Sequence, residues 1–426
     1  MARKMKDSGI EWIGEIPEGW TKNKVIRLFD TIGSGTTPKN ITSDFPVVNW
    51  IQSGDITGSF MPACKNVISA NLLSQYSALK VYPAPFIIIA MYGASVGNAS
   101  ISLIDGCVNQ ACCVLSSPSC NLHYAFYVIK SAQSYLVRKA VGGGQPNISQ
   151  ETIKQLWLPL PPLSTQDIIV RNLDATCSKI DDLLSSVHAS IEEYKKLKQA
   201  VITQAVTKGV RGEREMKDSG VEWIGEIPVD WEISRIKYVS IFEPSCDFRK
   251  LTPETIITYS PMECIKNGTF ERRTSLYGNL AHTLTPFQNG DIVMAKVTPC
   301  FENGNIAIMN ELQSGYGLGS SELFVFRPQN INTRYLFYWL QNKLFVHQAC
   351  ATMTGTGGLK RISPSFVKNC NIHYPSTAEQ AQIAAYLDTK CAEIDKLIAK
   401  KEQLVKELDS YKKSLIYEVV TGKRKV

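Results

Sequence analysis

A duplication constrains this chain of 426 residues more than any other feature. Residues 5–20 read MKDSGIEWIGEIPEGW and residues 216–231 read MKDSGVEWIGEIPVDW, so 13 of 16 positions are identical. A second block, over positions 143–181, recurs over positions 357–395, whereas segments 21–141 and 232–354 share no comparable identity. Such self-similarity marks a repeated structural unit. The sequence therefore predicts two domains with one frame and different middle segments.

Each copy begins with a segment of mixed α/β character. Short apolar runs alternate with Gly, Asn and Pro, which is typical of strands separated by turns. The predicted strands lie at residues 46–51, 86–91, 291–296 and 323–326, and the predicted helical stretches lie at residues 124–139 and 333–349. The fold class that we predict for both globular domains is α/β (mixed).

Each copy ends in a long amphipathic helix. Residues that alternate steps of four and three along it are mostly apolar, which is typical of the a and d positions of a coiled coil. We call these positions the seam: Ile169, Leu173, Thr176, Ile180, Leu184, Val187, Ile191, Tyr194, Lys198, Val201 and Ala205 in the first copy, and Ile383, Leu387, Lys390, Ile394, Ile398, Lys401, Val405, Leu408, Lys412, Leu415 and Val419 in the second. Capping boxes are predicted at the helix starts, from Ser164 with Asp167 and from Ser376 with Glu379.

Covalent connection predicts how these helices run. The first begins at one globular domain and ends at the other, and at ~1.5 Å per residue it extends ~65 Å. If the second helix buries its seam against the first, it runs back, so the pair is antiparallel and the chain has a pseudo-two-fold axis. The predicted segments are a globular domain over 1–162, a central helix over 163–212, a second globular domain over 213–375 and a C-terminal helix over 376–426. The alternative is that each helix packs on its own domain.

Further apolar side chains flank the seam. A stripe wider than two positions per heptad indicates another packing surface. Either a partner protein or the chain's own globular domains would cover this flank, which consists of Leu183, Leu197, Leu397, Leu404 and Tyr411.

Composition narrows the class of protein. Lys and Arg number 46 against 39 Asp and Glu, and the formal charge of +7 favours a polyanionic partner without requiring one. The first residues lack the apolar core of a secretory signal, and no apolar run reaches the length of a membrane span. The 12 cysteines follow no disulfide framework or zinc-ligand spacing. We expect a cytoplasmic protein with no metal site.

Two different domains joined by helices suit a two-part target, and double-stranded DNA fits because its helical repeat presents one face to two readers. Sequence reading needs polar side chains at groove edges and Lys or Arg on phosphates. Loops of this composition predict the following DNA-binding residues, although each loop alone also fits an ordinary turn: Ser34, Thr36, Thr37, Lys39, Asn40, Gln52, Ser53, Tyr92, Ser95, Asn98, Gln145 and Asn147 in the first domain, and Lys296, Thr298, Asn303, Tyr316, Ser320, Lys360 and Arg361 in the second.

Two common catalytic motifs are absent from the sequence. It contains no GxxxxGK[ST] and no HExxH pattern. Glu193 and Lys195 have a nuclease-like spacing, but Tyr194 between them is a seam residue, so a solvated helix face explains them better. We predict a DNA-binding protein that is not an enzyme. A protein-binding scaffold is one rival, which a shallow salt dependence of binding would favour, and a self-sufficient methyltransferase or nuclease is another.

Four stretches together carry a family resemblance: the repeated DSG[IV]EWIGEIP blocks, GDIVMAKVTPCFENGN at 290–305, GGGQPNIS at 142–149, and LPLPPLSTQ before the first long helix. The chain resembles the specificity (S) subunit of type I restriction-modification systems over nearly its whole length. The resemblance implies two target recognition domains that each read half of a bipartite asymmetric site, with helices that set the gap. It also implies docking of two methyltransferase (M) subunits and, in the full complex, restriction-translocase (R) subunits. The cofactors S-adenosylmethionine, ATP and Mg would belong to those partners, and none to this chain.

Overall fold

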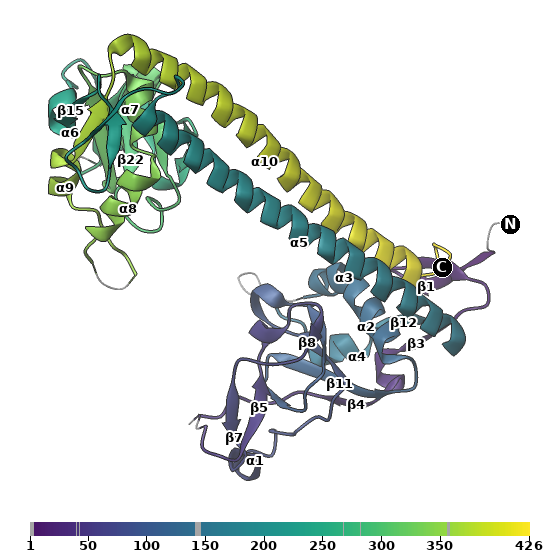
Figure 1. Cartoon of the computed structure of the whole chain (residues 1–426). Coiled ribbons are helices and arrows are strands. Elements are labelled where there is room, and N and C mark those ends of the chain that lie inside the picture. The colour runs from purple at the N-terminus through teal and green to yellow at the C-terminus, as the bar shows by residue number, and fades with distance from the viewer. Residues whose placement is uncertain are drawn as a thin grey trace. The chain divides into compact units, whose positions relative to one another are not determined.

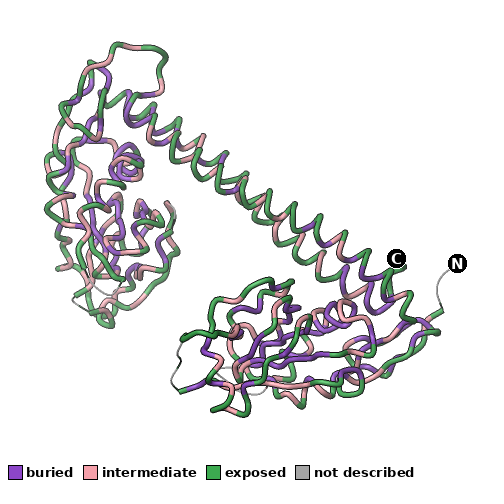
Figure 2. The backbone as a smooth tube through the Cα atoms, turned by 60° about the horizontal axis from the view of Figure 1, so that its bottom comes forward, coloured by how far each residue is buried: buried purple, intermediate pink, exposed green. Residues whose placement is uncertain are grey.

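The structure is a computed structural model. It describes residues 4–39, 41, 43–140, 146–266, 268–281, 283–355 and 358–426. The chain forms two compact units, each with its own core (Figures 1 and 2). Unit 1 consists of Met1–Val187 with Gln403–Val426, and unit 2 consists of His188–Glu402. Each unit therefore contains one globular domain and parts of both long helices.

Unit 1 is built around a five-stranded sheet in the order β4-β11-β8-β9-β6. Alternate residues of β8 (Phe86–Ala90) enter different cores, which explains why this strand is apolar throughout. The other strands are β1 Met5–Ile10, β2 Gly14–Pro17, β3 Thr21–Lys24, β4 Phe29–Gly33, β5 Val47–Ile51, β6 Phe60–Met61, β7 Val67–Ser69, β9 Ala99–Ser102, β10 Cys107–Val108, β11 Cys112–Pro118 and β12 Trp157–Leu160. The short helices are α1 Leu72–Gln75, α2 Leu122–Ser131, α3 Gln133–Arg138 and α4 Gln150–Lys154.

Unit 2 contains two four-stranded sheets, in the orders β16-β25-β22-β23 and β20-β17-β24-β21. Its strands are β13 Met216–Asp218, β14 Glu226–Pro228, β15 Glu232–Arg235, β16 Ser240–Phe242, β17 Ile256–Ser260, β18 Ile265–Lys266, β19 Thr269–Phe270, β20 Arg273–Leu276, β21 Thr285–Gln288, β22 Ile292–Ala295, β23 Ile306–Ile308, β24 Tyr316–Gly319, β25 Leu323–Pro328 and β26 Asn371–Tyr374. The short helices are α6 Ile236–Val239, α7 Thr333–Trp339, α8 Lys343–Ala351 and α9 Pro364–Asn369.

The two units share one strand plan, even in segments 21–141 and 232–354, which share no comparable sequence identity. In unit 1 β8 lies between β11 and β9, and in unit 2 β22 lies between β25 and β23, all antiparallel. A second, parallel pair also recurs, β5 with β10 and β17 with β24. The duplicated frame and the mixed α/β class are therefore confirmed.

The long helices run antiparallel within each unit. They are α5 Leu163–Lys208 and α10 Thr377–Val420. In unit 1 the first half of α5 packs against the last part of α10, and in unit 2 the last part of α5 packs against the first half of α10 (Figure 1). All predicted seam residues are buried or half-buried, which confirms the heptad assignment. The first turns of both helices also join their own domain's core, so the alternative packing holds there.

Two ion pairs occur at equivalent seam positions. In unit 2 the Nζ atom of Lys198 lies 2.7 Å from a carboxylate oxygen of Asp395. In unit 1 the Nζ atom of Lys412 lies 2.5 Å from a carboxylate oxygen of Asp181. Both lysine side chains are less than one-fifth exposed. Lys198 and Lys412 are thus partnered by carboxylates of the opposite helix, which supports the antiparallel alignment.

The predicted capping boxes are wrong, because contacts with the globular domains fix the helix starts. Helix α5 already includes Ser164. The Gln166 side chain holds this start, since its Oε1 accepts from the Asn121 backbone N–H and its Nε2 donates to the Pro161 carbonyl. Gln380 makes the corresponding bonds in unit 2, and Glu379 binds Arg214 instead of closing a box.

A buried tyrosine ties each long helix to its domain. The Tyr124 hydroxyl lies 2.9 Å from the Pro159 carbonyl oxygen and 3.0 Å from that of Val420. The Tyr335 hydroxyl in unit 2 reaches the carbonyl oxygens of His373 and Val206 in the same way.

Among the described residues, no helix is both long enough and apolar enough to cross a membrane.

His373 differs from its counterpart Pro159 and predicts a pH dependence for unit 2. Its Nε2 lies 2.7 Å from the Val206 carbonyl oxygen and therefore carries the proton, whereas its Nδ1 is buried and has no partner in the described part of the chain. A second proton on the ring would have no acceptor. Burial accordingly lowers the pKa of His373 to about 4.

Because the unfolded chain binds a proton near pH 6.5 and the folded chain does not, we expect unit 2 to lose stability as the pH falls from 6.5 to 4, by about 3 kcal/mol in all. Urea unfolding at several pH values, followed by hydrogen exchange of unit 2 amides, measures this loss. The substitution His373→Leu should flatten the profile, whereas His347→Leu, at an exposed histidine, should not. An equal slope in wild type and H373L would contradict the assignment.

Candidate nucleic-acid interface

The turn at residues 109–111 gathers several predicted DNA-binding loops of unit 1. The backbone N–H of Asn109 donates to the carbonyl of Ile51 at 3.1 Å, which brings the following residue, Gln52, to this turn. The backbone N–H of Met91 donates to the Ala111 carbonyl at 2.7 Å, which brings Tyr92 to it as well. Parallel pairing of β5 with β10 makes this possible, because it places the ends of both strands at one edge.

The segment after β4 joins the same turn. The Thr37 hydroxyl donates to the Gln110 side-chain oxygen at 2.6 Å, and the Ser34 hydroxyl donates to the Cys112 carbonyl at 2.7 Å. Farther along, the Lys39 backbone N–H donates to the Tyr76 hydroxyl. Thr37 and Lys39 are exposed. Gln110 was not predicted as a site residue, and its position in a turn between two apolar strands was the available signal.

The C-terminal end of the predicted GGGQPN loop meets the β8–β9 connection. Tyr92 pairs with Asn147 as an antiparallel bridge, and the Ile148 backbone N–H donates to the Met91 carbonyl at 2.9 Å. Tyr92 and Asn147 are both exposed. Asn40 and Gln145 lie outside the described residues.

Unit 2 contains an equivalent turn at residues 320–322. The Ser320 backbone N–H donates to the Ser260 carbonyl, and the Lys296 backbone N–H donates to the Glu322 carbonyl at 3.0 Å. These bonds match those of Asn109 and Met91 in unit 1. The predicted residues Lys296 and Ser320 are therefore brought together at this turn. The Ser320 hydroxyl also accepts a hydrogen bond from the Glu322 backbone N–H.

Arg361 is held rigidly at this turn. Its guanidinium donates from Nε to both Glu322 oxygens, at 3.0 and 3.2 Å, and from Nη2 to one of them at 2.6 Å. The hydrogen bonds from Arg361 lower the pKa of Glu322, so both groups are charged at neutral pH. Glu322 was not predicted from the sequence. It is far from Arg361 along the chain, so there was no local pattern to find.

Thr298 fixes the loop that carries Lys360. The Thr298 backbone N–H donates to the Lys360 carbonyl, and the Lys360 backbone N–H donates to the Thr298 hydroxyl, both at 2.9 Å. The same hydroxyl donates to the Gly358 carbonyl. Lys360 is exposed, and its ammonium group has no ion pair within the described residues. This arrangement suits a contact with a phosphate.

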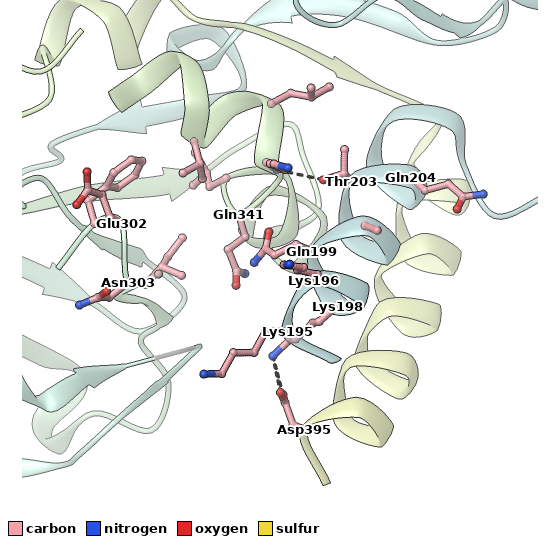
Figure 3. Close-up of a pocket in the computed structure, with 18 of the residues that line it drawn as sticks. Lys195, Lys196, Lys198, Gln199, Thr203, Gln204, Glu302, Asn303, Gln341 and Asp395 are labelled. Atoms are coloured by element: carbon pink, nitrogen blue, oxygen red, sulfur yellow. Dashed lines mark hydrogen bonds and ion pairs between the residues drawn. The ribbon is translucent and has the colours of Figure 1, made fainter. Parts of the chain in front are cut away.

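Asn303 lies apart, in a groove of unit 2 with a volume of about 1480 Å³. Figure 3 shows Asn303 and Glu302 across this groove from Lys195 and Gln199 of α5. Five lysines and five acidic residues line the groove, so it has no net charge. Two of the lysines are paired, Lys195 with Glu192 and Lys198 with Asp395. A neutral groove does not attract a phosphate backbone.

The remaining predicted residues have contacts inside their own domains. Gln52 and Asp55 form a reciprocal cap of a short 3-10 helix next to Ser53. The Asn98 side-chain oxygen accepts from Gln133. Tyr316 packs on Phe248 with a ring-centroid distance of 5.7 Å. Three further predicted residues are half-buried at these loops, namely Ser53, Thr36 and Ser95. Whether any of these side chains reaches DNA stays a prediction.

The helix flank remains uncovered in both units. Leu183 and Tyr411 are 54% and 47% exposed in unit 1, and Leu404 of the same unit is 41% exposed. Leu397 and Leu197 are 41% and 48% exposed in unit 2. By the alignment of the second repeat block, Leu183 matches Leu397 and Leu197 matches Tyr411. The globular domains therefore leave one apolar patch uncovered on the helices of each unit.

Comparison with known proteins decides the family. The family model for the type I restriction modification DNA specificity domain matches twice, at residues 17–193 and 228–407. The chain belongs to this family. Each match includes one globular domain and much of the long helix that follows it. A role of the two specificity domains in DNA sequence specificity follows from this membership.

Relatives and solved structures agree with the two specificity domains. The chain is 32% identical over 163 residues to the EcoEI specificity subunit of Escherichia coli, a match that covers 37% of the chain and 27% of that subunit. The chain thus spans about a quarter of the length of the EcoEI and EcoAI specificity subunits of Escherichia coli. It is 26% identical to the MjaVIII specificity subunit of Methanocaldococcus jannaschii over 71% of the chain and 70% of that subunit.

The solved structures show the fold. A chain solved in work on complex assembly and conformational transition of the type I R-M system superimposes with a TM-score of 0.71 at 15% identity, covering 95% of this chain and 98% of that one. The HsdS subunit from Thermoanaerobacter tengcongensis gives a TM-score of 0.50 at 16% identity, with 96% and 98% covered. Both structures support a fold in which two specificity domains are linked by helices.

Proposed function

We propose that the chain is a non-catalytic, double-stranded DNA-binding subunit that directs type I modification and restriction subunits to a bipartite asymmetric site. Each globular domain reads one half of that site, and the long helices set the gap between the halves. The observation that carries this proposal is the pair of equivalent turns, 109–111 and 320–322, each of which gathers loops from the divergent middle of its domain. One frame that presents two different sets of polar side chains suits two different half-sites.

The partners of this function follow from the same duplication. Two matching apolar patches on the helices, represented by Leu183 and Leu397, suit two copies of one partner. We assign them to two methyltransferase (M) subunits, with restriction-translocase (R) subunits in the full complex. Those subunits would supply the chemistry that uses S-adenosylmethionine, ATP and Mg, and this chain would bind none of these. The complex acts on DNA in the cytoplasm.

Domain exchange tests the function. Residues 21–141 are replaced by the corresponding segment of another specificity subunit, and the complex with its M subunits is expressed in a host without other methyltransferases. We expect one half of the methylated motif to change and the other half to stay as it was, because the exchanged segment contains most of the predicted loops of unit 1 and none of unit 2. Methylome sequencing reports both halves and the gap together.

The reciprocal exchange of residues 232–354 is the matched control, and it should change the other half. If either exchange altered both halves or neither, the modular proposal would be wrong. Binding of the wild-type complex to its site should also fall steeply with salt concentration, since each neutralised phosphate releases counterions. A flat salt profile would favour the protein-binding scaffold instead.

A further inference from the structure

Asn147 and Arg361 occupy the same place in the two units. They align with each other in the second repeat block, and their backbones share two contacts. Asn147 bridges to Tyr92 as Arg361 bridges to Val297. The next residue, Ile148 or Ile362, donates its backbone N–H to the carbonyl of Met91 or Lys296 at 2.9 Å in both units. The two units thus present different side chains at one structurally defined position.

Arg361 leaves one edge of its guanidinium open. Its Nε–Nη2 edge is used by Glu322, as the three distances of 2.6 to 3.2 Å show. The edge formed by Nη1 and the second proton of Nη2 has no partner among the described residues, and the side chain is 48% exposed. Two parallel N–H groups of this kind match the O6 and N7 acceptors of guanine.

Asn147 offers the other common purine-reading group. Its side chain is exposed and makes no hydrogen bond with the described residues of unit 1. A carboxamide donates and accepts side by side, which matches N7 and the N6 amino group of adenine. Asparagine and arginine at one position therefore correspond to two different bases.

The residue under this position changes with it. Ala111 and Glu322 are equivalent, because each accepts from the backbone N–H that follows β8 or β22, that of Met91 or Lys296. Glu322 orients Arg361, whereas a short asparagine needs no such partner and unit 1 has alanine there. The two positions vary together as a pair, in the way that a guanine reader with a supporting carboxylate differs from an adenine reader without one.

We infer that Asn147 and Arg361 are specificity-determining residues, one for each half-site, and that Asn147 selects adenine and Arg361 selects guanine. Glu322 acts through Arg361 as a positioning residue. This inference rests on the proposed function, since it assigns bases to residues of the same recognition domains.

Exchanging the pairs between units tests the inference in the complex with M subunits. We expect R361N/E322A, which copies unit 1, to change one guanine to adenine in the half-site of unit 2, and N147R/A111E to change one adenine to guanine in the half-site of unit 1. A bidentate contact discriminates by about 5- to 150-fold, so competition between oligonucleotides that differ at this base pair measures the switch. Methylome sequencing identifies the base pair.

Two single variants keep the test decisive if a double variant assembles poorly. R361Q retains a long side chain and should also prefer adenine, whereas E322Q should weaken discrimination at that base pair alone. K360A is the matched control. It removes a neighbouring contact with a phosphate, and losing that contact should lower the affinity equally for all sequences.

The possible outcomes separate the two levels of the proposal. A wild-type complex that methylates no split site would contradict the proposed function itself. A wild-type complex with a normal split site, whose R361Q and N147R/A111E variants read unchanged bases or lose affinity uniformly, would overturn only the assignment of these two residues.

Discussion

Replacing Arg214 by methionine is expected to destabilise unit 2 by about 3 to 5 kcal/mol, because it leaves a buried carboxylate without its partner. Glu379 is only 2% exposed, and its Oε1 lies 2.6 Å from Nη1 of Arg214. Arg214 also donates to Asp230 and stacks near the Trp231 ring. It thereby joins the segment after α5 to the first turn of α10. Chemical denaturation of the chain without partner subunits measures the loss in free energy of unfolding.

The matched control is Arg249→Met, which removes an arginine that is 89% exposed and pairs with Asp247. We expect a change below about 0.5 kcal/mol for R249M, since surface ion pairs contribute little. Arg211 lies 3.9 Å from Glu379 and is 53% exposed, so it compensates only weakly. If R214M were as stable as R249M, Glu379 would have to be neutral or hydrated in the folded chain. Unit 1 should be unaffected, because position 165, the counterpart of Glu379, is threonine.

The parts of this fold that follow a period could be predicted from the sequence. Steps of four and three residues placed Leu173 and Leu387 in the seam, and both are fully buried. The duplication likewise predicted two domains with one frame, whereas the equivalent strand pairs lie in segments 21–141 and 232–354, which share no comparable identity, and they were not predicted. Periodic patterns work in these cases since burial on one face of an element is a local property of its sequence.

The helix starts could not be predicted in the same way. Ser164 and Glu379 fit a capping pattern, but tertiary contacts decide their surroundings. Gln166 and Gln380 anchor the first turns to the residues that cap α2 and α7, and Arg214 binds the carboxylate of Glu379. Tertiary contacts decide the surroundings of these residues because the two energies differ. A cap contributes about 1 kcal/mol, whereas leaving a buried carboxylate without its partner costs about 3 to 5 kcal/mol.

The composition of the loops predicted part of the candidate site, and the strand pairing of the fold shows which loops come together. The polar loops around Thr37, Tyr92 and Lys360 stand out in the sequence, yet nothing local shows that they meet at the turns after β10 and β24. Gln110 and Glu322 became visible only there, because each belongs to a short connection between apolar strands. Asn303 shows the converse case, since its loop has suitable residues but lines a neutral groove.

Inserting one heptad into both long helices is expected to move the two half-sites apart by about three base pairs. Seven helical residues add ~10.5 Å at ~1.5 Å per residue, and one base pair occupies ~3.4 Å along DNA. The insertions follow Val187 in α5 and Glu402 in α10, where one compact unit ends and the other begins along the chain. Seven residues are one full heptad, so the seam stays in phase. The bases read in each half should not change, because no loop of either domain is altered.

The gap is measured by methylome sequencing of cells that express the variant with its M subunits. Three extra base pairs also rotate one half-site around the duplex by roughly a third of a turn, so we expect weaker binding as well as a longer gap. A two-residue insertion in both helices is the informative control, because at 3.6 residues per turn it rotates the seam by about 200° and should prevent a stable helix pair. An unchanged gap with the heptad variant would show that the helices connect the domains without measuring the distance between their targets.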